Sequence, residues 1–376
     1  MRRRVLVSGA LLAALAVPSV AAADSVFGIR GLGLLGRPLS GRAAGTGGAF
    51  SLFDAASPLN PAALAQWQGP AGWGVGAASS RRFASGSTST TLGSTRFPLF
   101  GFAVPAGQRM VVGVSVSDYL DRTWSVTTTS ADTLRGDSVT LTDAASSTGG
   151  VTDLRFGAAY RISPSFVAGI GIHALAGSTQ MSVERSFSDS GYIAYRDVAT
   201  TNFSGVGVSL GAQGRLSDHV ALAGAVRLNA RLTAKADNGA TARVAMPAEI
   251  SGGVMFAPVL GVGFAATVGY QTWARSAGDL EAAGQDRSRS VWNVALGAEI
   301  DVLRRRMPLR IGYRWRQLPF PVAGSWLSEH AFSGGLGLTL AGGRATLDVG
   351  VDVGSRTAGS ATEKFTTGFV GVIVRP

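Results

Sequence analysis

The chain has 376 residues, contains no cysteine and carries a formal net charge of +11. Without cysteine it can form no disulfide and no cysteine-ligated metal site, so an exported fold of this length must be held together by other means. A basic balance can indicate nucleic-acid binding. The sequence has no lysine- or arginine-rich cluster and no RNA-binding motif, so no nucleic-acid partner is expected.

Residues 1–23 have the pattern of an export signal. Three arginines, Arg2–Arg4, precede the apolar run Val5–Val17, which is too short to span a bilayer. Small residues at 21–23 offer a cleavage site before Asp24. No later stretch has 18 consecutive apolar residues, so no transmembrane helix is expected. The sequence therefore predicts a signal peptide over residues 1–23.

Residues 24–71 lack the alternation of a strand. The stretch FDAASPLNPAAL (53–64) is alanine-rich, mildly apolar and interrupted by Pro58 and Pro61, so it is unsuited to a long helix. About 300 residues that alternate regularly follow it. We expect residues 24–71 to form a compact unit that serves the strands after them.

Residues 72–376 alternate with a period of two, which is typical of strands. In LRIGYRWR (309–316), Leu309 and Ile311 fall on one face, and Arg310 and Arg314 on the other. A half-buried strand of a soluble sandwich would also alternate, but a soluble barrel points its bulky residues inward. Here the bulky face suits lipid and the small, polar face suits a lumen, which is the pattern of an outer-membrane barrel.

The connections predict the topology. Strands are expected near 72–82, 95–105, 109–120, 149–162, 165–176, 203–216, 218–232, 243–257, 260–273, 289–303, 306–317, 329–341, 343–354 and 365–375. Tight turns follow the even-numbered strands, and longer polar connectors, the longest at 121–148 and 177–202, follow odd-numbered ones. An even count places both termini in the periplasm and leaves no sheet edge unpaired in lipid. The predicted fold class is therefore all-β: a closed antiparallel transmembrane β-barrel of about 14 strands (72–376), with residues 24–71 as a plug in its lumen.

The stretch SGRAAGTGGAFSLFDAASPLNPAALA (40–65) resembles the N-terminal hatch of the FadL family of outer-membrane long-chain fatty-acid transporters. The matching positions include the hatch residues Asp54, Asn60, Pro61 and Ala62. The resemblance implies a 14-strand barrel that passes hydrophobic compounds inward without ATP or a cofactor, through a hatch and a lateral opening in the wall. The sequence shows no counterpart of the strand kink that makes this opening.

The resemblance also implies the partners and one alternative. The expected partners are outer-membrane lipid, lipopolysaccharide and an apolar small-molecule ligand. Shuttle proteins of type IX secretion share the same hatch-and-barrel plan, so a secretion-system or protein-interaction component, with a protein partner, is the alternative function.

The inward-facing arginines are the sharpest chemical feature of the sequence. A guanidinium group suits bidentate binding of a carboxylate. Acidic residues share the inward parity, so ion-pair ladders that brace the barrel remain open beside a ligand clamp. Across the turn from Arg310 lie Glu299 and Asp301, which predicts a structural role for Arg310. We expect Arg314 or Arg316 to face a ligand carboxylate or a lipopolysaccharide phosphate.

The longest connectors carry aromatic residues that could capture an apolar ligand or could belong to interfacial girdles: Tyr119, Trp124, Tyr192 and Tyr195. The three histidines, at 173, 219 and 330, are dispersed, and the sequence marks no serine as a nucleophile beside one of them. No catalytic residue, metal ligand or enzymatic activity is therefore expected.

Overall fold

The computed structural model describes residues 25–86, 88–302, 307–322 and 324–376, so the predicted signal peptide lies outside the described residues. The strands are β1 (Leu34–Leu35), β2 (Ala71–Ser85), β3 (Thr88–Pro105), β4 (Met110–Asp121), β5 (Trp124–Leu134), β6 (Asp137–Arg161), β7 (Phe166–Phe187), β8 (Tyr195–Arg215), β9 (Val220–Asn229), β10 (Leu232–Ala236), β11 (Thr241–Val244), β12 (Glu249–Val259), β13 (Val262–Gln271), β14 (Val291–Val302), β15 (Met307–Gln317), β16 (Ser328–Leu340), β17 (Ala345–Ala358) and β18 (Ala361–Val374). Short helices are η1 (Val26–Ile29), α2 (Gly41–Gly45), η2 (Pro61–Gln66), η3 (Trp273–Ser276), α3 (Ala277–Ala282) and η4 (Ala341–Gly343). No helix of these residues is long and apolar enough to cross a bilayer.

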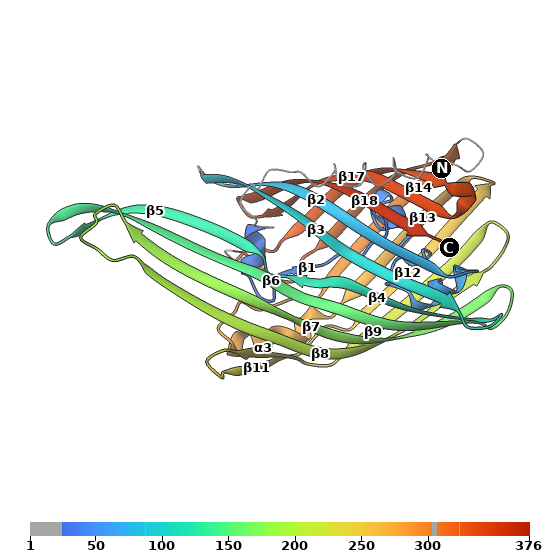
Figure 1. Cartoon of the computed structure of the whole chain (residues 1–376), viewed down its shortest axis with the longest axis horizontal. Coiled ribbons are helices and arrows are strands. Elements are labelled where there is room, and N and C mark those ends of the chain that lie inside the picture. Colours follow the sequence, from blue (N-terminus) through green and yellow to red (C-terminus); the bar gives the residue numbers. More distant parts are fainter. Residues whose placement is uncertain (1–24, 87, 303–306, 323) are drawn as a thin grey trace, which may run out of the picture.

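A closed antiparallel barrel of 14 strands forms the body of the molecule (Figure 1). Its wall consists of β2–β4, β6–β9 and β12–β18, and the antiparallel pairing of β18 with β2 closes the ring. β4 pairs directly with β6, and β9 directly with β12. The predicted fold class is confirmed.

The alternation predicted for the wall is present. On β15, Leu309 and Ile311 are 46% and 68% exposed toward the outside of the barrel, whereas Arg310 and Arg314 are 6% and 4% exposed in the lumen. Bulky residues also point inward at several places, for example where Trp73 and Leu99 pack with Leu64 of the N-terminal segment, and where Leu175 and Phe203 pack with its Leu32. The lumen is thus polar, except where that segment fills it with apolar side chains.

The segments 121–148 and 177–202 are not the irregular connectors that the sequence predicted. They form β5 and the ends of β6, β7 and β8, which extend far beyond the rest of the wall as an arm (Figure 1). β6 pairs with β5 from Trp124↔Ser147 to Leu134↔Asp137, so the hydrogen bonds of a sheet continue outside the barrel. We call this side of the barrel the arm end and the opposite side, which carries the short connections, the turn end.

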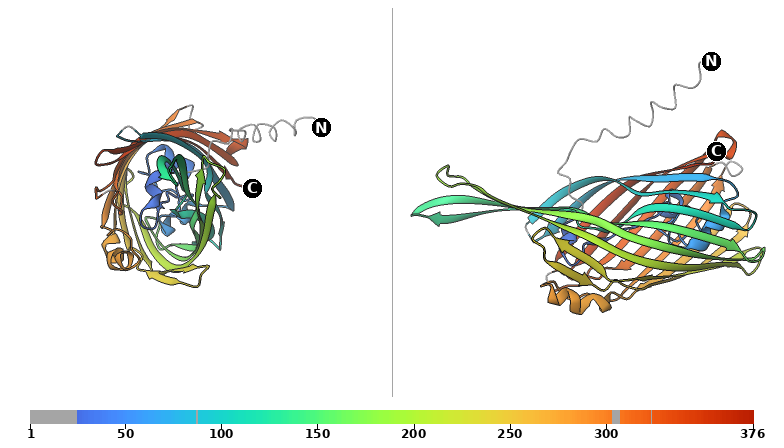
Figure 2. Two further views of the ribbon diagram at one scale, coloured as in Figure 1. Left: turned by 90° about the vertical axis from the view of Figure 1, so that its left-hand side faces the viewer. Right: turned by 60° about the horizontal axis from the view of Figure 1, so that its bottom comes forward.

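Residues 25–70 form the plug, which lies inside the ring of strands (Figure 2). Near the arm end, Ser25 donates a hydrogen bond to Glu363 of β18. Near the turn end, η2 contacts β6, β7 and β8. The plug therefore crosses the lumen from the arm end to the turn end before β2 begins.

Candidate functional site

The Asn60-Pro61-Ala62 motif holds the plug against the wall. The side-chain oxygen of Asn60 accepts a hydrogen bond from the Ala62 N–H and so caps η2, whose first residue is Pro61. Its amide donates to the Leu52 carbonyl within the plug and to the Ala212 carbonyl on β8. Asn60 is completely buried, so these partners satisfy a group that would otherwise be costly to bury.

Two wall glycines make room for this motif. A Cβ atom at Gly211 would lie 2.0 Å from the Asn60 Oδ1 atom, and one at Gly169 would lie 2.4 Å from the Ala62 nitrogen. The plug therefore approaches the wall at these two positions more closely than any wall side chain would allow.

Asp54 stabilises the loop before Asn60, because it accepts hydrogen bonds from the Ser40 hydroxyl and the Ala56 N–H.

An ion-pair network, partly buried where it includes the plug, joins the plug to β14–β18. Arg42 of the plug binds Glu299 in a bidentate manner, with Nη2–Oε1 at 2.8 Å and Nε–Oε2 at 3.0 Å. Arg310 also binds Glu299, at 2.6 Å, and reaches Asp348 at 2.5 Å. Near the arm end, Arg37 of the plug lies 3.1 Å from Asp352. Carboxylates of the wall thus serve arginines of both the wall and the plug.

Arg314 and Arg316, which were expected to face a ligand, both pair with carboxylates of the wall. Arg314 donates from Nε to Glu329 at 2.8 Å and from Nη1 to Asp352 at 2.7 Å, and Arg316 donates from Nη2 to Glu329 at 2.9 Å. Glu329 was missed as a partner because the sequence pattern does not specify the register that places it opposite Arg316. Within the described residues, the Arg316 Nε atom is buried without a hydrogen-bond partner. Arg316 therefore keeps a donor available, and the role of either arginine in ligand binding stays a prediction.

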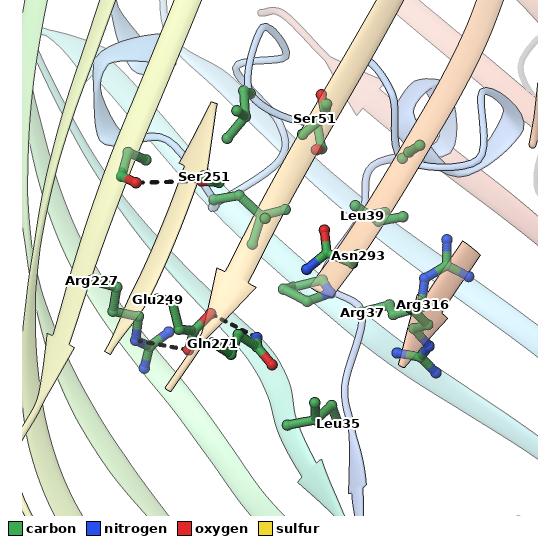
Figure 3. A pocket seen from close by; sticks show the side chains of 18 of the residues that line it. Leu35, Arg37, Leu39, Ser51, Arg227, Glu249, Ser251, Gln271, Asn293 and Arg316 are labelled. Atoms are coloured by element: carbon green, nitrogen blue, oxygen red, sulfur yellow. Dashed lines mark hydrogen bonds and ion pairs between the residues drawn. The ribbon is translucent and has the colours of Figure 1, made fainter. Parts of the chain in front are cut away.

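Two cavities lie on either side of the plug segment 35–39. Cavity 1, of about 190 Å³, is lined by apolar plug residues such as Leu35 and Leu39, and by polar wall residues such as Arg227 and Glu249 (Figure 3). Cavity 2, of about 160 Å³, lies on the side of β2, β3 and β18. Arg37, Arg314 and Arg316 line both cavities. Movement of segment 35–39 would therefore join two adjacent spaces.

The wall is interrupted beside cavity 2. The ladder between β3 and β4 runs from Pro105↔Val111 only as far as Leu99↔Ser117. Beyond it, β4 pairs on that edge with β1 of the plug, through Leu35↔Leu120 and Leu34↔Asp121. Tyr119, Leu120 and Asp121 are all buried, so β4 has left the lipid-facing surface there. Among the described residues, the 88–98 part of β3 pairs only with β2.

The sequence did not reveal this gap between β3 and β4. Pro98, which has no N–H group to donate, stands where the β3–β4 ladder ends and lines cavity 2. An ion pair crosses the gap: Arg96 on β3 lies 2.7 Å from Asp121 and 3.9 Å from Asp118 on β4. Side chains rather than backbone hydrogen bonds therefore hold this part of the wall together.

The structure does not gather the predicted aromatic residues into one groove. Tyr119 is buried and lines cavity 1, and its hydroxyl donates a hydrogen bond to Glu249 at 3.0 Å. Trp124 is buried at the base of the arm, at the start of β5. Tyr192 stacks on Phe187 near the tip of the arm, and Tyr195 there is 60% exposed. Of the predicted ligand-binding residues, only Tyr119, Arg314 and Arg316 share a cavity, and capture by the others stays a prediction.

Comparison with known proteins gives the fold and a family. No curated protein matches the sequence. Solved structures with this fold include the CymD monoaromatic hydrocarbon channel (14% identity, 90% of this chain and 97% of that chain, TM-score 0.59). Also similar is a Pseudomonas aeruginosa FadL homologue, with 12% identity over 92% of this chain and 99% of that chain and a TM-score of 0.61. The Ralstonia pickettii toluene transporter TbuX has 14% identity over 90% of this chain and 98% of that chain, with a TM-score of 0.57. The predicted resemblance to the FadL family is confirmed at the level of the fold.

Among protein families, the model described as BamG matches residues 1–251. The match covers the plug, the arm and the interrupted wall, which are the features that distinguish this barrel from a simple pore. It extends over about two thirds of the chain, and the chain therefore belongs to the BamG family.

Proposed function

We propose that the protein is a passive channel of the outer membrane for small hydrophobic compounds. The observation that carries this proposal is the interrupted β3–β4 ladder beside cavity 2. A compound that enters cavity 1 can pass segment 35–39 into cavity 2 and leave between β3 and β4 into the lipid, without crossing the lumen through water. Because short turns of such barrels lie on the periplasmic side, the proposal places the turn end in the periplasm and the arm outside the cell.

The size of the cavities favours a small ligand. An apolar cavity of about 150 Å³ holds one benzene molecule, and the two cavities here have about 190 and 160 Å³. The names of CymD and TbuX give a monoaromatic hydrocarbon channel and a toluene transporter, which agrees with ligands of this size. A long-chain fatty acid would have to occupy both cavities, with its carboxylate at the free Nε–H of Arg316.

Uptake of labelled toluene by cells with and without the protein tests the proposal. Ser94 lines cavity 2, so Ser94→Trp should reduce uptake to the level of cells that lack the protein. Thr95→Trp adds the same bulk on the exposed side of the same strand and should leave uptake unchanged. Wild-type cells that take up toluene no faster than deletion cells would refute the channel. Equal uptake by the two tryptophan variants would refute the route through the gap.

A protein-interaction role is the second candidate, and two observations favour it. The name of the BamG family indicates the context of barrel assembly in the outer membrane. The arm presents sheet well beyond the barrel, where a partner could reach it (Figure 1). Because the chain has no cysteine, Ser130→Cys on β5 gives a single site for a thiol-specific cross-linker. A partner captured from Ser130→Cys, but not from lipid-facing Thr95→Cys, would support this role.

A further inference from the structure

Three side chains on adjacent strands form a linear hydrogen-bonded chain on the wall of cavity 1. Asp153 lies on β6, His173 on β7 and Ser209 on β8, and all three line the cavity. The cross-strand partners of His173 are Arg155 and Gly207, so Asp153 and Ser209 each lie two residues from a direct partner of the histidine. At that diagonal spacing, long side chains of neighbouring strands can reach each other on the same face.

The two ring nitrogens of His173 face the partners that they have in a Ser-His-Asp triad. The His173 Nδ1 atom lies 2.9 and 3.0 Å from the two carboxylate oxygens of Asp153. Its Nε2 atom lies 2.9 Å from the Ser209 hydroxyl. A carboxylate beside Nδ1 favours the tautomer with its proton on that atom, which leaves Nε2 free to accept the serine proton. A triad is recognised by this geometry and not by the order of its residues in the chain.

A glycine makes room for the serine hydroxyl. The direct partner of Ser209 on β7 is Gly171, where a Cβ atom would lie 2.5 Å from the Ser209 hydroxyl, so a larger residue there would displace the hydroxyl. The hydroxyl also borders cavity 1, which the apolar plug residues Leu39, Leu52 and Pro58 line.

A fourth residue supplies a donor for developing negative charge. Arg227 on β9 is the direct cross-strand partner of Ser209. Its Nη1 atom donates to Asp153 at 2.7 Å, and its Nε atom donates to Asn229 at 2.8 Å. Within the described residues, its Nη2 atom is buried and has no hydrogen-bond partner. Arg227 lines cavity 1 (Figure 3), so this donor is available to an oxyanion that forms beside Ser209.

We propose that Ser209, His173 and Asp153 are a catalytic triad that hydrolyses esters of small apolar acids inside the lumen. The Ser209 oxygen attacks the ester carbonyl while its proton passes to the His173 Nε2 atom, and the Arg227 Nη2–H donates to the oxyanion. The carbon–oxygen bond to the alcohol then breaks, and the alcohol leaves with the proton from His173. Water, activated by His173, releases the acid from the acyl-serine and restores the hydroxyl.

Covalent labelling of the full chain in detergent micelles tests the triad. An alkyl fluorophosphonate should form one adduct, located at Ser209 by peptide mass spectrometry, and 4-nitrophenyl butyrate should be hydrolysed. Ser209→Ala should abolish both reactions, and His173→Gln should slow both by at least about 100-fold, because the general base is lost. Ser251→Ala is the matched control, since Ser251 lines the same cavity and donates only to a backbone carbonyl.

Heat-modifiable migration on a gel checks that each variant retains the folded barrel. An unlabelled wild-type protein, an adduct at another serine, or unchanged turnover in folded Ser209→Ala would each overturn the proposal. The adduct position is read from the wild-type protein, so the result does not depend on the folding of a variant. Uptake of toluene requires none of these residues, so the triad and the channel can fail separately.

Discussion

At the residue scale, the cost of burying charge decides the arrangement of the lumen. Glu329 is completely buried and lies at the centre of three arginines: Arg314, Arg316 and Arg356, at 2.8, 2.9 and 2.7 Å. A buried carboxylate is tolerated only when charged partners and hydrogen bonds offset its lost hydration. Arg356 also pairs with Glu363, so the network continues to β18.

The substitution Glu329→Gln should be strongly destabilising. It keeps the shape of the side chain but removes the charge that three guanidinium groups share, and breaking a buried pair costs about 3–5 kcal/mol. Unfolding by urea in lipid vesicles measures the change in the free energy of unfolding. Glu184→Gln, on the exposed part of β7, is the control and should change it by less than about 0.5 kcal/mol. Equal stability of the two variants would show that the network does not brace the barrel.

The sequence predicted the arginines of this network but not their partners. Period-two parity places Arg310, Arg314 and Arg316 in the lumen without further information. The partner of Arg316 is Glu329, its direct neighbour across β15 and β16. That register depends on the loop 318–327, whose geometry the sequence pattern does not specify. The triad was missed for the same reason, because Asp153, His173 and Ser209 meet only through the registers of β6, β7 and β8.

At the scale of elements, the strands of the wall could be predicted and those of the arm could not. A wall strand has one face in lipid, so its sequence alternates. The arm segment DSVTLTDAASST (137–148) has few bulky residues on either face and reads as a polar connector. Backbone hydrogen bonds to β5 and β7 hold this segment as a strand, whereas a wall strand is also held by the burial of one of its faces. The sequence of β4 did not predict its inward turn either, because there β4 pairs with β1 of the plug and not with a neighbouring wall strand.

The fit of the plug against β8 can be tested with one methyl group. Gly211→Ala would place its Cβ atom 2.0 Å from the Asn60 Oδ1 atom, so the plug must move or lose its cap. Loss of such a cap costs about 1 kcal/mol. We expect more frequent openings in planar-bilayer recordings and faster proteolysis of the plug. Gly214→Ala on the same strand meets its nearest neighbour at 3.6 Å and should behave like the wild type; identical recordings for both variants would contradict the close fit.

The segment 245–248, which leads into β12, should loosen in acid. The Ala245 N–H donates to Asp279 at 2.8 Å, and this bond, with the nearby Arg231 at 2.6 Å, lowers the pKa of the Asp279 carboxyl. A carboxyl with a lowered pKa stabilises the fold above its unfolded pKa of about 4, and this contribution disappears as the pH falls through the folded pKa. Hydrogen exchange at 245–248 should therefore increase, relative to the intrinsic rate, as the pH is lowered from 7 to 3.

In the Asp279→Asn variant, the protection factors of residues 245–248 should depend less on pH than in the wild type, because the carboxyl that titrates is gone. Glu281→Gln on the same helix is the control, since its ion pair with Arg287 is largely exposed and contributes little. A pH dependence that persists in Asp279→Asn would assign the effect to another group.

At the scale of the whole molecule, the plug is part of the wall as well as an obstruction. It supplies the strand that pairs with β4 where β3 diverges. It also supplies partners to carboxylates on three wall strands: Arg42 to Glu299, Arg37 to Asp352 and Ser25 to Glu363. Each of these carboxylates keeps an arginine of the wall as a second partner. The wall can therefore stay closed without the plug, although it should be less stable.

Deletion of residues 25–66 should accordingly open the lumen and weaken the barrel together. A 14-strand ring without its plug encloses a water-filled channel, so single-channel conductance should rise by at least about tenfold over the intact protein. The urea midpoint should fall, because the hydrogen bonds and ion pairs to the plug are lost. Heat-modifiable migration verifies that the barrel still forms. A folded deletion variant that conducts no better than the intact chain would show that wall side chains, rather than the plug, close the lumen.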